Sequence, residues 1–232
     1  MIKYIFILLI LTSCRPQSTS GDDVHDSQDS VMIVDENINK KIELHNLEII
    51  NYDTLQWAEI LPSENIQLDI RYATTNNFTK EIIYDCPRCF IRRSSLKAFE
   101  NIVADLKRQN YGIKLFDCYR PHPAQEKLWS IVTNPMYVAD PKKGSMHNRG
   151  HAIDVTLTDL NGKELDMGTP FDFFGKRAYH DFTDLPVDIL QRRRILKETM
   201  ASHGFQHIRT EWWHYSDENN WSDISSFEWA CN

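Results

Sequence analysis

The sequence lacks several features that would assign its class directly. It has no apolar run near the ~20 residues that a membrane-spanning helix needs, and it contains no internal repeat. Positive charge is scarce, because 26 Lys and Arg face 33 Asp and Glu and give a net charge of −7. Without a large basic stripe we expect no nucleic-acid binding. The run Arg192-Arg193-Arg194 lies inside an expected helix, and we interpret it as a solvated face.

The N-terminus carries a short apolar stretch, YIFILLIL, at residues 4–11. A stretch of this length after a lysine is typical of a secretory signal. It ends in Leu11-Thr12-Ser13-Cys14, which places small residues directly before a cysteine. We therefore expect a lipoprotein signal peptide over residues 1–14, with Cys14 lipidated as the mature N-terminus. The alternative is an ordinary signal peptide with a chance cysteine.

The residues after this signal divide into a tether and a domain. Residues 15–36 are polar and acidic, and we expect a flexible tether. Residues 37–232 are enough for one compact domain with a real core. The expected location is outside the cytoplasm, on the periplasmic side or at the cell surface, with the lipid on Cys14 as the one link to the membrane.

Four cysteines remain for this domain: Cys86, Cys89, Cys118 and Cys231. In an oxidising compartment they favour disulfides, and four cysteines allow three pairings. Cys86-Pro-Arg-Cys89 could instead be half of a zinc knuckle or a redox pair. There is no second CxxC, and no βαβ pattern surrounds this one, so we favour disulfides or free thiols and leave the pairing open.

The expected elements mix helices and strands without a βαβ rhythm. Apolar periodicity predicts a helix over 94–110, Pro121 begins a second helix, and a third is expected over 186–203, closed by Gly204. Strands are expected over 112–120 and within 204–216. Asn161-Gly162 predicts a type I′ turn in a hairpin over 151–167. Residues 168–185 are irregular and aromatic, as functional loops often are. We predict an α+β domain with a mostly antiparallel sheet and flanking helices.

A first cluster of candidate ligands lies in SMHNRGHAID, residues 145–154. In the strand that begins there, Ile153 faces the core and Asp154 the opposite, open face. Gly150 gives the backbone the freedom to bring His147 back toward Asp154. The pair could bind a metal ion, or it could be a simple His–Asp hydrogen bond at a loop edge. The neighbouring His151 shares the parity of Ile153, and we interpret it as structural, like His122, His180, His203 and His207.

A second cluster, EWWHY at residues 211–215, adds a histidine and a spare carboxylate. A catalytic zinc typically takes three His or carboxylate ligands and keeps one position for water. His147, Asp154 and His214 supply that set. Glu211 is left over as a general base that takes a proton from the water activated by the metal. There is no HExxH, which excludes the helical protease motif, and the spacing of Glu211 and His214 predicts a bulge or turn between them.

A third candidate is Arg120 in FDCYRP, residues 116–121. It falls at the end of an expected strand, just before a helix that begins at a proline. A guanidinium at this rim can point into a cleft and stabilise an oxyanion, which can lower a barrier by roughly 3–4 kcal/mol. The alternative is an arginine paired with a surface carboxylate.

Five stretches together closely resemble one enzyme family: SMHNRGHAID, EWWHY, FDCYRP, DIRYATTNNF (69–78) and MGTPFD (167–172). They resemble the D-alanyl-D-alanine dipeptidases, the vancomycin-resistance type of zinc peptidase within the D-alanyl-D-alanine carboxypeptidase (peptidase M15) family. The resemblance covers about residues 55–220 in order. It implies a hedgehog-like or D,D-peptidase-like fold with one zinc in a cleft on the open sheet face. It implies zinc on His147, Asp154 and His214, Glu211 as catalytic base, and Arg120 as transition-state stabiliser.

The resemblance also implies how substrate is held. Asp172, the last residue of MGTPFD, would bind the free ammonium by charge pairing, and Ser145 would hydrogen-bond the substrate. Trp213 would wall the pocket. One departure is Cys118, which stands where a small residue such as glycine is expected. The other cysteines belong to no catalytic pattern of the family.

The implied function is zinc-dependent hydrolysis of the D-alanyl-D-alanine dipeptide to D-alanine. The first alternative is a zinc D,D-carboxypeptidase that acts on peptidoglycan stem peptides through a more open cleft. The second is an inactive module that binds wall peptides. The expected partner is a small D,D-dipeptide, and the oligomeric state stays open.

Overall fold

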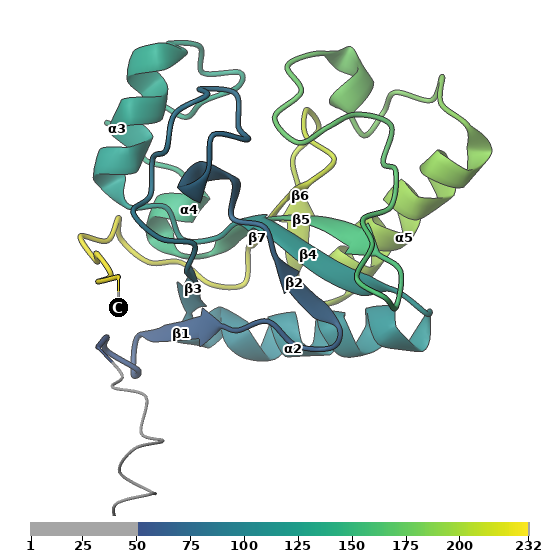
Figure 1. Ribbon diagram of the computed structural model, residues 1–232, viewed down its shortest axis with the longest axis horizontal. Coiled ribbons are helices and arrows are strands. Elements are labelled where there is room, and N and C mark those ends of the chain that lie inside the picture. Colours follow the sequence, from purple (N-terminus) through teal and green to yellow (C-terminus); the bar gives the residue numbers. More distant parts are fainter. Residues whose placement is uncertain (1–50, 232) are drawn as a thin grey trace, which may run out of the picture. The chain divides into compact units, whose positions relative to one another are not determined.

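The computed structural model describes residues 51–231 of the chain (Figure 1). The expected signal peptide over 1–14, the lipidated Cys14, the tether over 15–36 and the first residues of the expected domain lie outside the described residues. Within the described part, no helix is both long and apolar enough to cross a membrane.

A five-stranded sheet forms the centre of the described domain. Its strands follow the spatial order β2 (Ile66–Leu68), β4 (Gly112–Asp117), β5 (Ala152–Thr158), β7 (His214–Asp217) and β6 (Phe205–His207). β2 runs parallel to β4, and every other neighbouring pair is antiparallel. A second sheet pairs β1 (Trp57–Ile60) with β3 (Cys89–Arg92). The predicted α+β class with a mostly antiparallel sheet is confirmed.

Two long helices supply much of the apolar cover of this sheet. They are α2 (Arg93–Arg108) and α5 (Val187–Ser202), and both match helices predicted from the sequence. In Figure 1, α2 runs along the lower part of the view beneath β2 and β4, and α3 (His122–Ile131) lies at the upper left. The remaining helices within residues 51–231 are short: α4 (Met146–Arg149) and two 3₁₀ turns, Arg71–Ala73 and Lys176–Ala178.

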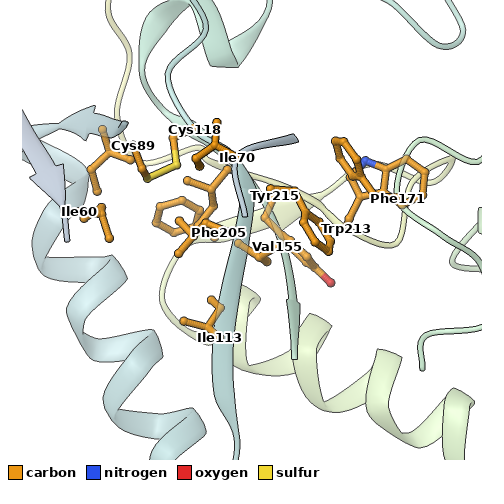
Figure 2. Packing of buried hydrophobic residues seen from close by; sticks show 14 of the residues in the cluster. Ile60, Ile70, Cys89, Ile113, Cys118, Val155, Phe171, Phe205, Trp213 and Tyr215 are labelled. Atoms are coloured by element: carbon orange, nitrogen blue, oxygen red, sulfur yellow. A yellow bond between two sulfur atoms is a disulfide. The ribbon is translucent and has the colours of Figure 1, made fainter. Parts of the chain in front are cut away.

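The alternation of the central strands places one set of side chains in a core. Ile113 of β4 is paired with Leu157 of β5, and Leu115 with Val155, so that these four side chains share a face. All four are buried, and burial of each such side chain contributes about 1.5–3 kcal/mol. Figure 2 shows Ile113 and Val155 in this core together with Phe205 of β6.

The predicted hairpin after β5 is only partly correct. β5 is followed by a single bridge between Thr158 and Glu164 rather than by a full second strand. The type I′ turn is wrong, because Asn161 does not take the positive φ that such a turn requires of both central residues. The carboxylate of Asp159 instead accepts the N–H groups of Asn161 and Lys163, both at 2.9 Å, and only Gly162 takes a positive φ.

The arginine run of α5 also differs from the prediction. Arg194 is exposed, but Arg193 is buried, with 4% of its surface accessible. Its guanidinium donates to the carbonyl oxygens of Met167, Tyr179 and Arg177 at 2.7, 3.2 and 3.1 Å. The interpretation of this run as a solvated face is therefore wrong for its central residue, which fastens the irregular segment 168–185 to α5.

The four cysteines form two disulfides. Cys89 of β3 is bonded to Cys118, which follows β4, and Cys86 is bonded to Cys231 near the C-terminus. Figure 2 shows the Cys89–Cys118 bond beside Ile60 and Ile70 at the edge of the core. The favoured use of these cysteines as disulfides is confirmed, and the zinc-knuckle and redox alternatives for Cys86 and Cys89 are not.

Candidate metal centre and cleft

Three predicted ligands converge at one point of the fold. Nε2 of His147 lies 3.0 Å from Nδ1 of His214 and 3.3 Å from Oδ1 of Asp154. The third separation, from His214 Nδ1 to Asp154 Oδ1, is 3.0 Å. They form the single group of three potential metal ligands among the described residues.

Neighbouring strands and one helical turn position these side chains. Asp154 of β5 is the direct cross-strand partner of His214 of β7, so both side chains leave the same face of the sheet. His147 comes from α4, whose first turn is capped by Ser145, and Gly150 ends α4 with a φ of 79°. That face of β5 is not open as predicted, because the whole strand is buried and Asp154 reaches only a cleft.

The spacing of the three ligand atoms fits a zinc ion. Tetrahedral zinc with bonds of ~2.0–2.1 Å separates its ligand atoms by ~3.3–3.4 Å, close to the observed values. Nδ1 of His147 lies 2.7 Å from the carbonyl oxygen of Cys118. Because a carbonyl can only accept, this bond places the proton on Nδ1 and leaves the Nε2 lone pair directed at the other ligands.

The charges in this group also favour a cation. Burial opposes ionisation of Asp154, but His147 and His214 hold the pKa of its carboxyl far below the usual range. Burial lowers the pKa of His214 and so favours the neutral ring, although Asp154 opposes this effect. Two neutral imidazoles and one carboxylate are the protonation states that zinc needs in its ligands.

Glu211 lines the same cleft in the turn before β7. This turn corresponds to the bulge or turn predicted between Glu211 and His214. Burial first, and then the charges of Asp154 and Asp172, raise the pKa of Glu211 well above its ordinary value. A raised pKa makes a carboxylate a stronger base, which suits it to accept a proton from water.

Arg120 is fixed at the edge of the cleft by buried partners rather than by a surface carboxylate. Its Nε and Nη2 donate to Oδ2 of Asp117 at 2.9 and 2.7 Å, and its Nη1 donates to Gln125 at 2.9 Å. Burial alone would lower the pKa of Arg120, but Asp117 and other nearby groups hold it well above its usual value. The guanidinium is therefore a permanent, oriented positive charge. Its Nη2 lies 3.9 Å from Asp154.

Asp172 enters the cleft from the irregular segment 168–185 with a φ of 58°, in the left-handed region. Both of its carboxylate oxygens lie within reach of the hydroxyl of Tyr72, at 3.3 and 3.2 Å. Burial first, and then the negative charge of Asp154, raise the pKa of Asp172 to about 8. A cation that binds beside such a buried carboxylate stabilises its ionised form strongly.

Ser145 also lines the cleft, but its hydroxyl is engaged in the cap of α4. It donates to Oδ1 of Asn148 at 3.0 Å and accepts from the Asn148 backbone N–H at 3.3 Å. The substrate contact predicted for Ser145 stays a prediction.

Aromatic and aliphatic side chains close the rest of the cleft. Trp213 forms part of the wall, as the sequence predicts, and its ring packs against that of Phe171 (Figure 2). The cavity measures about 170 Å³, below the ~300–1,000 Å³ of common ligand pockets. The site therefore suits a very small substrate.

Sequence reasoning missed three residues of the site: Asp117, Gln125 and Tyr72. Asp117 and Tyr72 lie inside stretches that were singled out, FDCYRP and DIRYATTNNF, but neither stretch showed which of its polar side chains pairs with a candidate residue. For Gln125, the only sequence feature that could have indicated a role in the site is its place one helical turn after Pro121.

The histidines interpreted as structural lie outside the metal group. His151 is buried between the hydroxyls of Ser95 and Ser222, at 2.9 Å from each. His203 pairs with Asp105, and His180 packs against the ring of His207.

Comparisons with known proteins point to one family. A family profile described as D-ala-D-ala dipeptidase, Peptidase M15, matches residues 51–230. The D-alanyl-D-alanine dipeptidase of Escherichia coli K12 is 34% identical over 158 residues, which cover 68% of this chain and 81% of that protein. The enzyme of the same name from Enterococcus faecalis is 32% identical over 171 residues, covering 65% and 85%.

One solved structure is also similar. It is a vancomycin-resistance D,D-pentapeptidase, VanY, crystallised as a point mutant with Zn(II). It has a TM-score of 0.38 and 13% identity, and the match covers 56% of this chain and 73% of that one.

Proposed function

Since this chain belongs to the Peptidase M15 family of D-Ala-D-Ala dipeptidases, we propose that its cleft hydrolyses the D-alanyl-D-alanine dipeptide to two molecules of D-alanine with one zinc ion. The observation that carries this proposal is the convergence of two histidines and one carboxylate, His147, Asp154 and His214, in a small cleft. Glu211, Arg120 and Asp172 line the same cleft.

The proposed ligands are His147 through Nε2, His214 through Nδ1 and Asp154 through Oδ1. When bound there, zinc supplies Lewis acidity, which polarises a carbonyl and lowers the pKa of water toward ~7. The chain itself holds three lone pairs at the right spacing and keeps the proton of His147 on Nδ1, where it donates to the carbonyl of Cys118.

Glu211 is the proposed general base. Its carboxylate accepts a proton from the attacking water and then donates it to the nitrogen of the leaving D-alanine. The raised pKa of Glu211 supports the first step, because it makes the carboxylate a stronger base than an ordinary glutamate.

Arg120 is the proposed stabiliser of the negative charge that develops on the attacked carbonyl oxygen. Asp117 and Gln125 orient its guanidinium before the substrate arrives. Such preorganised donors are typically worth roughly 3–4 kcal/mol of the barrier.

Asp172 is proposed to bind the free ammonium of the dipeptide, with the Tyr72 hydroxyl beside it. The ammonium would relieve the cost of a buried carboxylate, which is apparent in the raised pKa of Asp172. A demand for an ammonium so near the scissile bond favours a dipeptide over the stem peptides of a D,D-carboxypeptidase, whose chain continues at that nitrogen.

The test compares three substrates with zinc-loaded protein whose metal content is measured. We expect rapid hydrolysis of D-alanyl-D-alanine, and at least 100-fold lower kcat/KM for its N-acetyl form and for a pentapeptide ending in D-alanyl-D-alanine. Equal rates on the pentapeptide would identify a carboxypeptidase. Bound zinc without hydrolysis of any of the three would identify a binding module.

We also propose that the protein is exported and held at a membrane by a lipid on Cys14, with the domain on the periplasmic side or at the cell surface. The apolar stretch at residues 4–11 and the small residues before Cys14 support this location, as do two disulfides, which form in oxidising compartments. Mass spectrometry of the mature N-terminus tests it. An unmodified N-terminus beyond Cys14 would contradict the anchor, and Cys14→Ala should move the protein from the membrane to the soluble fraction.

A further inference from the structure

We infer that the disulfide between Cys89 and Cys118 is a positioning device for the metal site, so that the zinc affinity of this chain depends on that bond. The inference rests on the metal site of the proposed function. It concerns the chain's own residues and does not involve the chemical step.

The link between the disulfide and the metal site is one peptide group. The carbonyl of Cys118 accepts the Nδ1 proton of His147 at 2.7 Å, the shortest hydrogen bond of that ring. Both residues are buried, with 1% and 3% of their surfaces accessible, so water does not replace this acceptor. The position of the Cys118 carbonyl therefore fixes the tautomer and the direction of the ring that presents Nε2 to the metal.

Cys118 is not paired with any strand of the central sheet, and its N–H donates to Oδ1 of the preceding residue, Asp117, at 2.9 Å. β4 ends at Asp117, and its register with β5 is already irregular between Leu115 and Asp117. The disulfide instead joins Cys118 to Cys89 of β3, a strand of the other sheet. The next residue continues this link, because the N–H of Tyr119 donates to the carbonyl of Phe90 at 2.8 Å. The disulfide therefore holds the chain in position directly after β4, where it no longer pairs with the central sheet.

The same segment holds the other side of the metal loop. The N–H of Arg120 donates to the carbonyl of His147 at 3.1 Å, and the amide of Asn148 donates to the carbonyl of Arg120 at 2.8 Å. A shift of Cys118 would therefore move the acceptor of the His147 ring and the backbone of α4 together.

The second disulfide is a natural control. Cys86 and Cys231 tie the loop before β3 to the C-terminus, and among the described residues neither cysteine hydrogen-bonds to a proposed ligand. It closes a loop of 145 residues against 29 for Cys89–Cys118. On chain entropy alone, removal of Cys86–Cys231 should lower the free energy of unfolding at least as much as removal of Cys89–Cys118.

The experiment measures zinc dissociation constants by competition with a chromophoric chelator. It uses the wild type, Cys89→Ala/Cys118→Ala and Cys86→Ala/Cys231→Ala, and mass spectrometry confirms the remaining disulfide in each. We expect about tenfold weaker zinc binding for the Cys89/Cys118 variant, the lower end of the effect of losing an outer partner of a ligand. The Cys86/Cys231 variant should bind zinc within twofold of the wild type, although the melting temperature falls in both.

Two results would overturn the inference: a Cys89/Cys118 variant that binds zinc as tightly as the wild type, or an equal loss in both variants, which would indicate a general effect of stability. If circular dichroism shows that an alanine pair does not fold, the near-isosteric serine pairs take its place in the same comparison. A wild type that binds no zinc contradicts the proposed function itself, which separates the two failures.

Discussion

Oδ2 of Asp117 accepts hydrogen bonds from both Nε and Nη2 of Arg120, at 2.9 and 2.7 Å. The other carboxylate oxygen, Oδ1, accepts the hydroxyl of Tyr84 at 2.8 Å and the N–H of Cys118 at 2.9 Å. One buried side chain thus connects the proposed oxyanion donor to the strand end from which it projects.

Asp117→Asn tests whether this orientation matters for catalysis. The amide keeps the size of the carboxylate but removes the charge that holds the guanidinium, so we expect kcat to fall about tenfold to a hundredfold. Zinc affinity should fall less than kcat, since Asp117 is not a proposed ligand and contacts the metal group only through its neighbours, with Oδ2 at 3.7 Å from Nδ1 of His147. Tyr84→Phe is the matched control, because it removes a bond to Oδ1 and leaves both bonds to Arg120. Equal losses of kcat in the two variants would mean that general packing is responsible.

Glu211→Gln tests the proposed base. The amide fills the same space but cannot accept the proton, so we expect a loss of about 10²–10⁴ in kcat. Zinc should still bind, and saturating zinc should raise the melting temperature of the variant as it does that of the wild type, because a ligand that binds only the folded state stabilises it. Glu211→Ala should likewise keep zinc. Turnover near the wild-type rate in either variant would reject the assigned base.

Asp172→Asn tests the ammonium site. The variant keeps a hydrogen-bond acceptor for Tyr72 but loses the negative charge, so we expect KM for D-alanyl-D-alanine to rise at least tenfold. The N-acetyl dipeptide has no ammonium, and its slow hydrolysis should be nearly the same in wild type and variant. A parallel loss on both substrates would assign Asp172 a role in the shape of the cleft instead.

Much of this fold follows from patterns that the sequence displays openly. The apolar periodicity of α2 reflects burial of one face, and α5 lies between Pro186 and Gly204. β5 forms where the alternating residues predict a strand, although both of its faces are buried. Disulfide pairing was beyond reach, because four cysteines allow three connections and the choice depends on how two sheets meet. Arg193 was misjudged because its partners are backbone carbonyls, which no side-chain pattern reveals.

The site residues likewise divide into those that the sequence predicts and those that depend on the tertiary structure. His147, Asp154, His214 and Glu211 could be selected because their residue types suit one kind of chemistry. The pairing of Asp117 with Arg120 could not be predicted, since it depends on the local irregularity at the end of β4. Where the chain leaves regular alternation, the direction of a side chain no longer follows from its parity.

His180 gives a prediction about stability that is independent of the metal. Burial first, and then the positive charges of His207, Lys197 and Arg193, lower the pKa of His180 to about 3, against ~6.5 in an unfolded chain. Between these values the unfolded chain binds a proton that the folded protein excludes. The free energy of unfolding should therefore fall as the pH drops from about 6.5 toward 3, and the contribution is fully present above 6.5.

His180→Phe removes this proton-binding site. Nε2 of His180 has no hydrogen-bond partner within the described structure, and the substitution also removes the hydrogen bond between the ring and the backbone of Glu211. Urea unfolding of metal-free protein in a chelator, at pH 7, 5 and 4, measures the effect without a contribution from zinc release. The variant should lose less stability than the wild type between pH 7 and pH 4, since its unfolded chain gains one proton fewer. Parallel pH dependence of the two proteins would mean that His180 is protonated equally easily in both states and is not held neutral by the fold.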